Sequence, residues 1–181
     1  MKIKETETVN NKVTKLVFGG LLVALGVLLP QAFHMFGTAG GGAFLPIHLP
    51  ILMAGLILGP YYGGCIGLLV PLLSSVLTGM PPAPKVYFMF FELVTYGVVT
   101  GIMIRKTNVY ISLLTAMVTG RVVYGLVLVM GVNFFGFTAP FANQAAFIGG
   151  IVAGIPGIAI QLLVLPILYM ALKKGGFTFE R

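Results

Sequence analysis

The feature that most constrains the fold is a pair of apolar runs separated by a very short turn. The runs are Leu49–Leu58 and Cys65–Leu77, and the residues Gly-Pro-Tyr-Tyr-Gly lie between them. A straight helix needs about 20 residues to cross a bilayer, and fewer where the bilayer thins, so each run is close to the minimum for a span. Because the join is too short to hold a domain, the sequence predicts a tight helical hairpin inside a membrane.

Small residues follow one another at every fourth position through this hairpin. They are Gly55, Gly59, Gly63 and Gly67. A stripe of this kind lets helix backbones approach closely, which lipid-embedded helices need because no hydrophobic effect drives them together. We therefore interpret the hairpin as a scaffold. The loops on either side of it, Thr38–Ala43 and Thr78–Pro82, are expected to form the mouth of a binding site.

The composition excludes an ordinary soluble domain. Hydrophobic residues make up 58% of the chain and charged residues 8%, whereas about a quarter of the residues of a soluble domain are charged. A single cysteine, Cys65, excludes a disulfide framework and a thiolate metal site. The net charge of +7 does not indicate nucleic-acid binding, because the Lys and Arg residues are found at the ends of apolar runs. The composition predicts an all-α integral membrane protein.

We expect six transmembrane helices in a single membrane domain, residues 13–174. A polar segment (1–12) precedes this domain and a short tail (175–181) follows it. Besides the hairpin, the expected spans are Val13–His34, Val86–Ile104, Val109–Val132 and Gln144–Leu172. A basic start before an apolar run also describes a secretory signal, but the membrane-embedded chain that follows needs a first helix.

The distribution of basic residues predicts the orientation. With six spans, the N-terminal segment, the Arg105-Lys106 turn and the tail are basic and fall on one side, whereas the opposite loops contain only Lys85. Positive charges favour the cytoplasmic side, so both termini are expected in the cytoplasm. The two loops that flank the hairpin and the Phe-rich loop Asn133–Asn143 then face outward together.

Glu92 and Arg121 are full charges inside expected spans. Placing either at mid-bilayer costs at least ~2.5–3.5 kcal/mol, so both should face the interior of the bundle. They could form a structural ion pair between two spans, or contact a ligand that enters from outside. The two interpretations are compatible if Glu92 orients Arg121 while Arg121 holds a ligand carboxylate in bidentate fashion.

Several uncharged polar residues accompany this pair. Tyr96 follows Glu92 by four residues and Tyr124 follows Arg121 by three, so each shares a helix face with its charge. Asn133 and Gln161 are candidate hydrogen-bonding groups, since an unpaired amide in lipid is costly.

Two histidines, His34 and His48, bracket the Gly-rich loop. We expect them to form hydrogen bonds near the membrane interface, with ligand contact as the next interpretation. Metal binding ranks last because no third ligand is within sequence reach.

The sequence lacks the common motifs for nucleotide binding and for metal-dependent or serine-dependent hydrolysis. There is no P-loop, no His-Glu-x-x-His and no Gly-x-Ser-x-Gly. The pattern indicates a binding protein that is not an enzyme, binds no cofactor or metal and does not use ATP itself.

These features together resemble a known family. The chain resembles the substrate-binding S-component of energy-coupling-factor (ECF) vitamin transporters in three motifs. They are a small-residue pair in the first span (Gly20 and Ala24), the Gly-Pro-x-Tyr-Gly hairpin and the Gly-Met-Pro-Pro loop. The resemblance covers Val13–Lys174 and is most specific over Leu45–Pro82.

The resemblance implies a function in the cell membrane of a prokaryote. An S-component captures a vitamin or vitamin precursor from outside, docks on a membrane scaffold subunit driven by two ATPase subunits, and topples to release the ligand inside. The scaffold contact of the family, usually Ala-x-x-x-Ala, would be made here by Gly20 and Ala24.

Ligand contacts in the family come from the loops after helices one and three and from the outer halves of helices four to six. Those places correspond here to Ala39–Phe44 and Thr78–Pro84, and to residues in the last three helices. The candidate ligand contacts are Gly41, Gly42, Gly79, Met80, Glu92, Tyr96, Arg121, Tyr124, Asn133 and Gln161.

The chain is most similar to the pantothenate type, and an arginine in the pocket suits a carboxylate. Pyridoxine, hydroxymethylpyrimidine and cobalamin remain open. A self-sufficient small secondary carrier or channel, a small intramembrane enzyme and a purely structural subunit are the alternatives from other classes.

Overall fold

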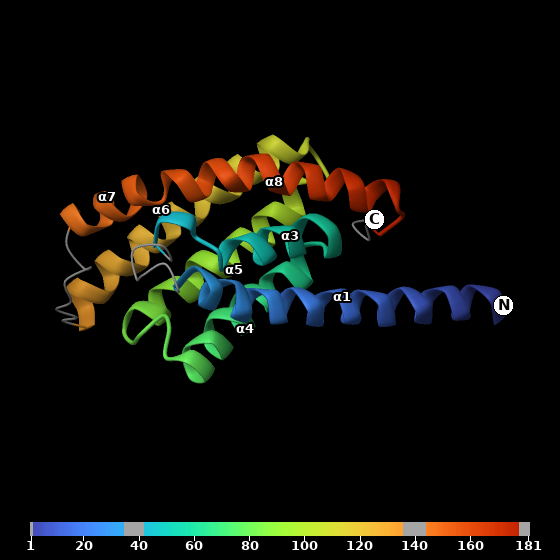
Figure 1. Ribbon diagram of the computed structural model, residues 1–181, viewed down its shortest axis with the longest axis horizontal. Helices are drawn as coiled ribbons and strands as arrows, with labels where there is room; N and C mark the ends of the chain where they lie inside the picture. Colours follow the sequence, from blue (N-terminus) through green and yellow to red (C-terminus); the bar gives the residue numbers. More distant parts are fainter. Residues whose placement is uncertain (1, 35–41, 136–143, 178–181) are drawn as a thin grey trace.

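The computed structural model describes residues 2–34, 42–135 and 144–177, and the regular elements in these ranges are all helices (Figure 1). Their bounds are α1 Lys2–His34, α3 His48–Leu58, α4 Pro60–Thr78, α5 Lys85–Met103, α6 Val109–Phe135, α7 Gln144–Ala153 and α8 Ile155–Lys174. In the described ranges, five helices are long and apolar enough to cross a membrane. The expected all-α membrane bundle is confirmed.

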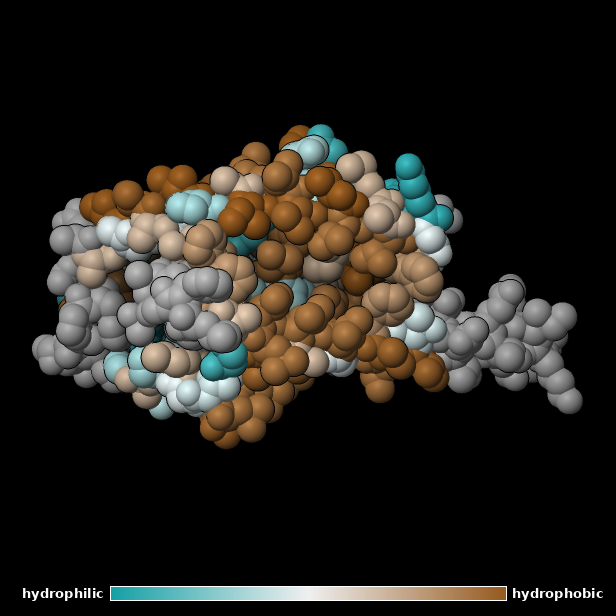
Figure 2. Space-filling model, in the orientation of Figure 1, coloured by the Kyte–Doolittle hydropathy of each residue, from teal (hydrophilic) through white to brown (hydrophobic). Residues whose placement is uncertain are grey.

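The surface agrees with a membrane environment. Figure 2 shows hydrophobic side chains, in brown, across the middle of the visible face, with paler and teal residues toward the ends. Large apolar side chains are exposed along the long helices, among them Leu21, Val118 and Leu163. A surface of this kind is stable where lipid tails replace water.

The helix α3 departs from the expected second span. It has 11 residues, which gives a length of about 16 Å, too short for a straight crossing. Instead of facing lipid, α3 occupies the centre of the bundle, where α1, α4, α5 and α8 pack around it. Its residues from Pro50 to Leu58 are all buried. The count of six spans is therefore not confirmed: the described residues form five helices of span length and the short buried helix α3.

The expected last span is also divided. Residues of Gln144–Leu172 form two helices, α7 and α8, which meet at Gly154. Of these, α8 alone is long enough to count as a span.

The tight hairpin predicted from the sequence is present between α3 and α4. Gly59 forms its turn with φ +90°, a backbone conformation that L side chains rarely adopt. Pro60 follows as the first residue of α4, where its missing N–H costs no hydrogen bond.

The glycine stripe of the hairpin packs mainly against α5. A Cβ added at Gly63 would meet the backbone of Gly97, and a Cβ added at Gly67 would meet the backbone of Leu93. On the other side, Gly101 lies against the backbone of Pro60. We call these contacts the glycine seam, comprising Gly55, Gly63 and Gly67 of the hairpin and Gly97 and Gly101 of α5. The seam fixes α5, which carries Glu92.

The basic segments gather at one end of the bundle. The beginning of α1, the turn between α5 and α6 and the last turn of α8 lie toward the same end, and the connection from α4 to α5 lies at the opposite end (Figure 1). Which side of the membrane each end faces stays a prediction.

Candidate ligand-binding site

A cavity of about 390 Å³ lies at the end of the bundle that holds the α4–α5 connection. Small-molecule sites have volumes of about 300–1,000 Å³. Its polar and charged lining residues are His48, Ser74, Lys85, Glu92, Arg121 and Tyr124, and its apolar ones include Pro30, Leu45, Met80, Pro81, Met89 and Phe147. The cavity thus combines an apolar wall with a few converging polar groups.

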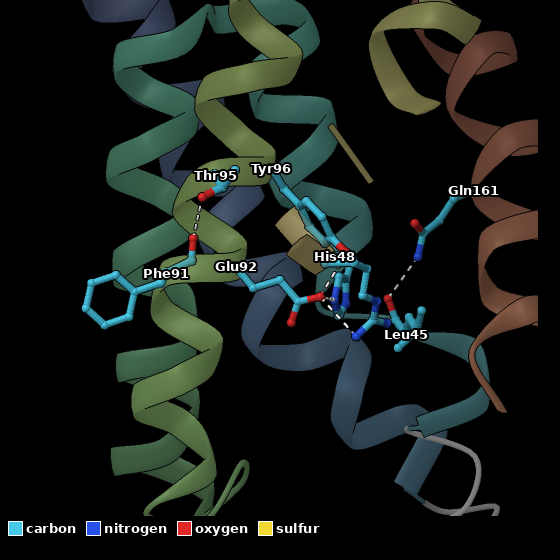
Figure 3. Close-up of polar contacts among 8 residues, drawn as sticks. Leu45, His48, Phe91, Glu92, Thr95, Tyr96 and Gln161 are labelled. Carbon is cyan, nitrogen blue, oxygen red and sulfur yellow. Dashed lines mark hydrogen bonds and ion pairs between the residues drawn. The ribbon is translucent and has the colours of Figure 1, made fainter. Parts of the chain in front are cut away.

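An ion pair forms the charged floor of this cavity. Arg121 Nη1 of α6 lies 3.0 Å from Glu92 Oε1 of α5, and the Tyr96 hydroxyl donates a hydrogen bond of 2.8 Å to the same oxygen. The preceding residue, Phe91, points to the opposite side of α5 and is 54% exposed (Figure 3). The helix therefore presents its carboxylate to the interior and its phenyl ring to lipid, as the cost of a charge in lipid requires.

The two charges differ in their access to the cavity. The Glu92 side chain is 2% exposed, whereas that of Arg121 is 20% exposed. A guanidinium has five N–H donors, and in the described part of the chain the ion pair with Glu92 is the contact found for Arg121. The arginine therefore keeps donors for a further acceptor, while the carboxylate is enclosed by its two partners.

Aromatic rings form one wall of the cavity. The Tyr124 ring of α6 stacks on Phe147 of α7, with centroids 6.1 Å apart and planes 10° from parallel. Tyr124 also packs with Phe88 of α5 and Leu128. Tyr124 and Phe147 thus give the cavity an aromatic surface beside Arg121.

The loop after α4 borders the cavity and is held by two serines of α4. Ser74 Oγ donates to the Met80 carbonyl at 2.7 Å, and Ser75 Oγ donates to the Pro81 carbonyl at 2.9 Å. Gly79 ends α4 with a left-handed φ of +71°. Met80 lines the cavity, so Gly79 turns the chain and Met80 faces the space.

A family model for the ECF transporter substrate-specific component matches residues 14–169. The chain belongs to this family. Comparisons with curated proteins and with solved structures found no match. Members of the family are transporter components and not enzymes, and membership implies a small-molecule substrate and association with an ECF module. Together with the long apolar helices, it makes the chain a multi-pass membrane protein.

Five of the residues predicted to bind ligand in this S-component lie around one cavity. They are Gly42, Met80, Glu92, Arg121 and Tyr124. Gly41 lies outside the described residues. Residues that precede α3, follow α4 and lie within α5 and α6 thus border one cavity, and their contact with a ligand stays a prediction.

Four other predicted residues of the S-component are not among those that line the cavity, and one of them is Gly79 at the end of α4. Tyr96 stands behind Glu92 and supports it. Gln161 is 1% exposed, and its Nε2 donates to the Leu45 carbonyl at 3.2 Å (Figure 3). Asn133 lines an apolar groove of about 950 Å³ along α6, and Arg121 and Phe147 border both this groove and the cavity. Gln161 therefore holds the segment before α3 in place and is not among the residues that line the cavity.

The site of the S-component also contains a residue to which the sequence analysis gave a lesser role. His48 is 3% exposed and lines the cavity. Its Nε2 lies 3.9 Å from Glu92 Oε1. The available signal was that His48 is the one polar side chain in the apolar sequence of α3.

The expected scaffold-contact residues of the S-component lie on the outer face of α1. Gly20 and Ala24 are both exposed, and a Cβ at Gly20 would meet nothing within 4 Å. This face is open to a partner helix, and the contact itself stays a prediction.

Proposed function

We propose that this S-component captures a small carboxylate-bearing vitamin, with pantothenate favoured, from outside the cell. The observation that carries the proposal is the unequal access of the two charges. Arg121 lines the cavity, is 20% exposed and keeps donors, whereas Glu92 is 2% exposed and is held by Arg121 and Tyr96. An anion is therefore the charged ligand that the cavity can receive without breaking an existing contact of Glu92.

Two further features support an anionic ligand of modest size. Lys85 adds a second positive charge to the cavity lining. The volume of about 390 Å³ is at the lower end of the range for small-molecule sites, about 300–1,000 Å³. It favours a ligand of the size of pantothenate or pyridoxine over the much larger cobalamin.

Energy for uptake would come from the partners. In this proposal the ligand-loaded chain docks through Gly20 and Ala24 on a membrane scaffold subunit, and two ATPase subunits hydrolyse ATP. The chain lacks a phosphate-binding loop of its own. A self-sufficient carrier would instead transport in liposomes without these partners.

The substrate can be identified without choosing candidates. The protein is purified in detergent from cells grown in rich medium and denatured, and the released small molecules are identified by mass spectrometry. We expect a carboxylic acid in stoichiometric amount. Release of a cationic vitamin would contradict the assignment of Arg121 as the ligand's charge partner.

Arg121→Ala tests the residue itself. We expect a loss of pantothenate affinity of about 100-fold or more, because a buried charge-assisted contact contributes about 2–5 kcal/mol. Arg121→Lys should recover part of the affinity, since lysine keeps the positive charge but cannot bind a carboxylate through two parallel N–H groups. Isothermal titration measures the affinity and thermal unfolding measures the stability. Unchanged affinity with a lower melting temperature would show a purely structural ion pair.

A further inference from the structure

A buried imidazole without a hydrogen-bond partner lies in the wall of the cavity. His48 begins α3 and is 3% exposed. Among the described residues, neither Nδ1 nor Nε2 of His48 has a hydrogen-bond partner. A neutral imidazole offers one donor and one acceptor, and leaving such groups unpaired in the interior lowers stability. An unpaired group of this kind in a cavity wall calls for an explanation.

Neighbouring residues account for the position of the ring but not for its hydrogen bonding. The distance of 3.9 Å from Nε2 to Glu92 Oε1 is too long for a hydrogen bond, and that oxygen already has Arg121 and Tyr96 as partners. The Tyr96 ring packs against the imidazole with centroids 5.2 Å apart. The His48 backbone N–H donates to the Leu45 carbonyl. The ring is therefore held in place with Nε2 near the Glu92 carboxylate and with neither nitrogen hydrogen-bonded among the described residues.

We propose that His48 is a ligand-binding residue that hydrogen-bonds a hydroxyl or amide group of the acid whose carboxylate lies against Arg121. The inference rests on the proposed function. Arg121 Nη1 and His48 Nε2 lie 3.0 Å and 3.9 Å from the same Glu92 oxygen, so the distance between these two nitrogens is no larger than the sum of the two. One small molecule can reach both.

The imidazole defines the class of substrate more narrowly than the arginine does. Hydroxyl and amide groups both donate and accept, so either satisfies a neutral histidine in either tautomer. An acid with a purely hydrocarbon body would leave the nitrogens unpaired. The substrate is thus a small hydroxy or amido acid.

The chain contains a matched control for this proposal. Thr100 of α5 also has a buried side-chain oxygen without a partner among the described residues. Its exposure is 0%, and it is not among the residues that line the cavity. Thr100→Val removes an unpaired polar atom away from the site, as His48→Leu does within it.

The test is isothermal titration of the purified full chain with two probes. Pantothenate carries a carboxylate, an amide and hydroxyls, and hexanoate carries a carboxylate on a hydrocarbon body. We expect His48→Leu to weaken pantothenate binding by about tenfold or more, and to leave hexanoate binding within about twofold. His48→Gln should retain most of the pantothenate affinity, and Thr100→Val all of it.

A stability measurement separates ligand binding from a structural role. Because the ring nitrogens are unpaired in the empty protein, His48→Leu should lower its melting temperature no more than Thr100→Val does. Equal pantothenate affinity in wild type and His48→Leu would overturn this inference alone. A parallel loss for both probes with a lower melting temperature would assign His48 to supporting Glu92. Failure of the wild type to bind either acid would overturn the proposed function, and this inference with it.

Discussion

The glycine seam and the ligand cavity share helix α5 but are built in opposite ways. At Gly97 the backbone of α5 touches the backbone of Gly63 with no space for a methyl group. At Glu92, five residues earlier, α5 borders a cavity of about 390 Å³. The seam is made of glycines, which have no side chains that could shift, whereas the cavity contains a charged pair and a histidine whose nitrogens have no hydrogen-bond partner among the described residues.

The contrast shows how a small membrane protein positions polar groups. Close backbone packing gives helices a fixed separation where no hydrophobic effect holds them together. A fixed α5 in turn fixes the carboxylate that orients Arg121. Groups left open for a ligand keep their geometry only when the surrounding elements are rigid. The seam thus supplies the rigidity on which the cavity depends.

The largest effect is expected from breaking the seam. Gly97→Ala would place a methyl group onto the carbonyl of Gly63, and because backbone must move, we expect a loss of about 3 kcal/mol or more. Thermal unfolding in detergent and ligand titration should both show the loss. Gly20→Ala is the matched control, since a methyl group there meets nothing. Equal melting temperatures for the two variants would contradict the packing described at Gly97.

An intermediate effect is expected at the edge of the cavity. Gln161→Met keeps the size of the side chain and removes the hydrogen bond to the Leu45 carbonyl, which contributes about 1 kcal/mol. We expect a severalfold weaker affinity for pantothenate, because the segment before α3 is held less firmly. Leu162→Met, one residue further along α8, should leave the affinity unchanged. A loss as large as that of Arg121→Ala would instead indicate that Gln161 contacts the ligand directly.

The smallest effect on the purified protein is expected on the outer face of α1. Gly20→Leu and Ala24→Leu change exposed positions, so ligand affinity and melting temperature should stay within experimental error. Uptake by cells that contain the full transporter should fall sharply, because a large side chain prevents close helix packing with a scaffold subunit. Normal uptake in both variants would refute the proposed docking face.

The sequence by itself determined the class of the protein. Its apolar content and run lengths predict an all-α membrane bundle. The short join containing Gly59 predicts the hairpin. The cost of a charge in lipid places Glu92 and Arg121 inside the bundle. These conclusions depend on properties that each segment has without its neighbours.

The tertiary structure alone decided which segments pack against one another and which polar groups meet. An apolar run such as Leu49–Leu58 suits both lipid and a protein core, and the surrounding helices make it the short buried α3. Gln161 reaches Leu45 across 116 residues of sequence. The sequence does not show that His48 is a buried imidazole in a cavity wall without a hydrogen-bond partner among the described residues. Hydropathy and spacing are local, whereas hydrogen-bond satisfaction depends on every helix that packs around a group.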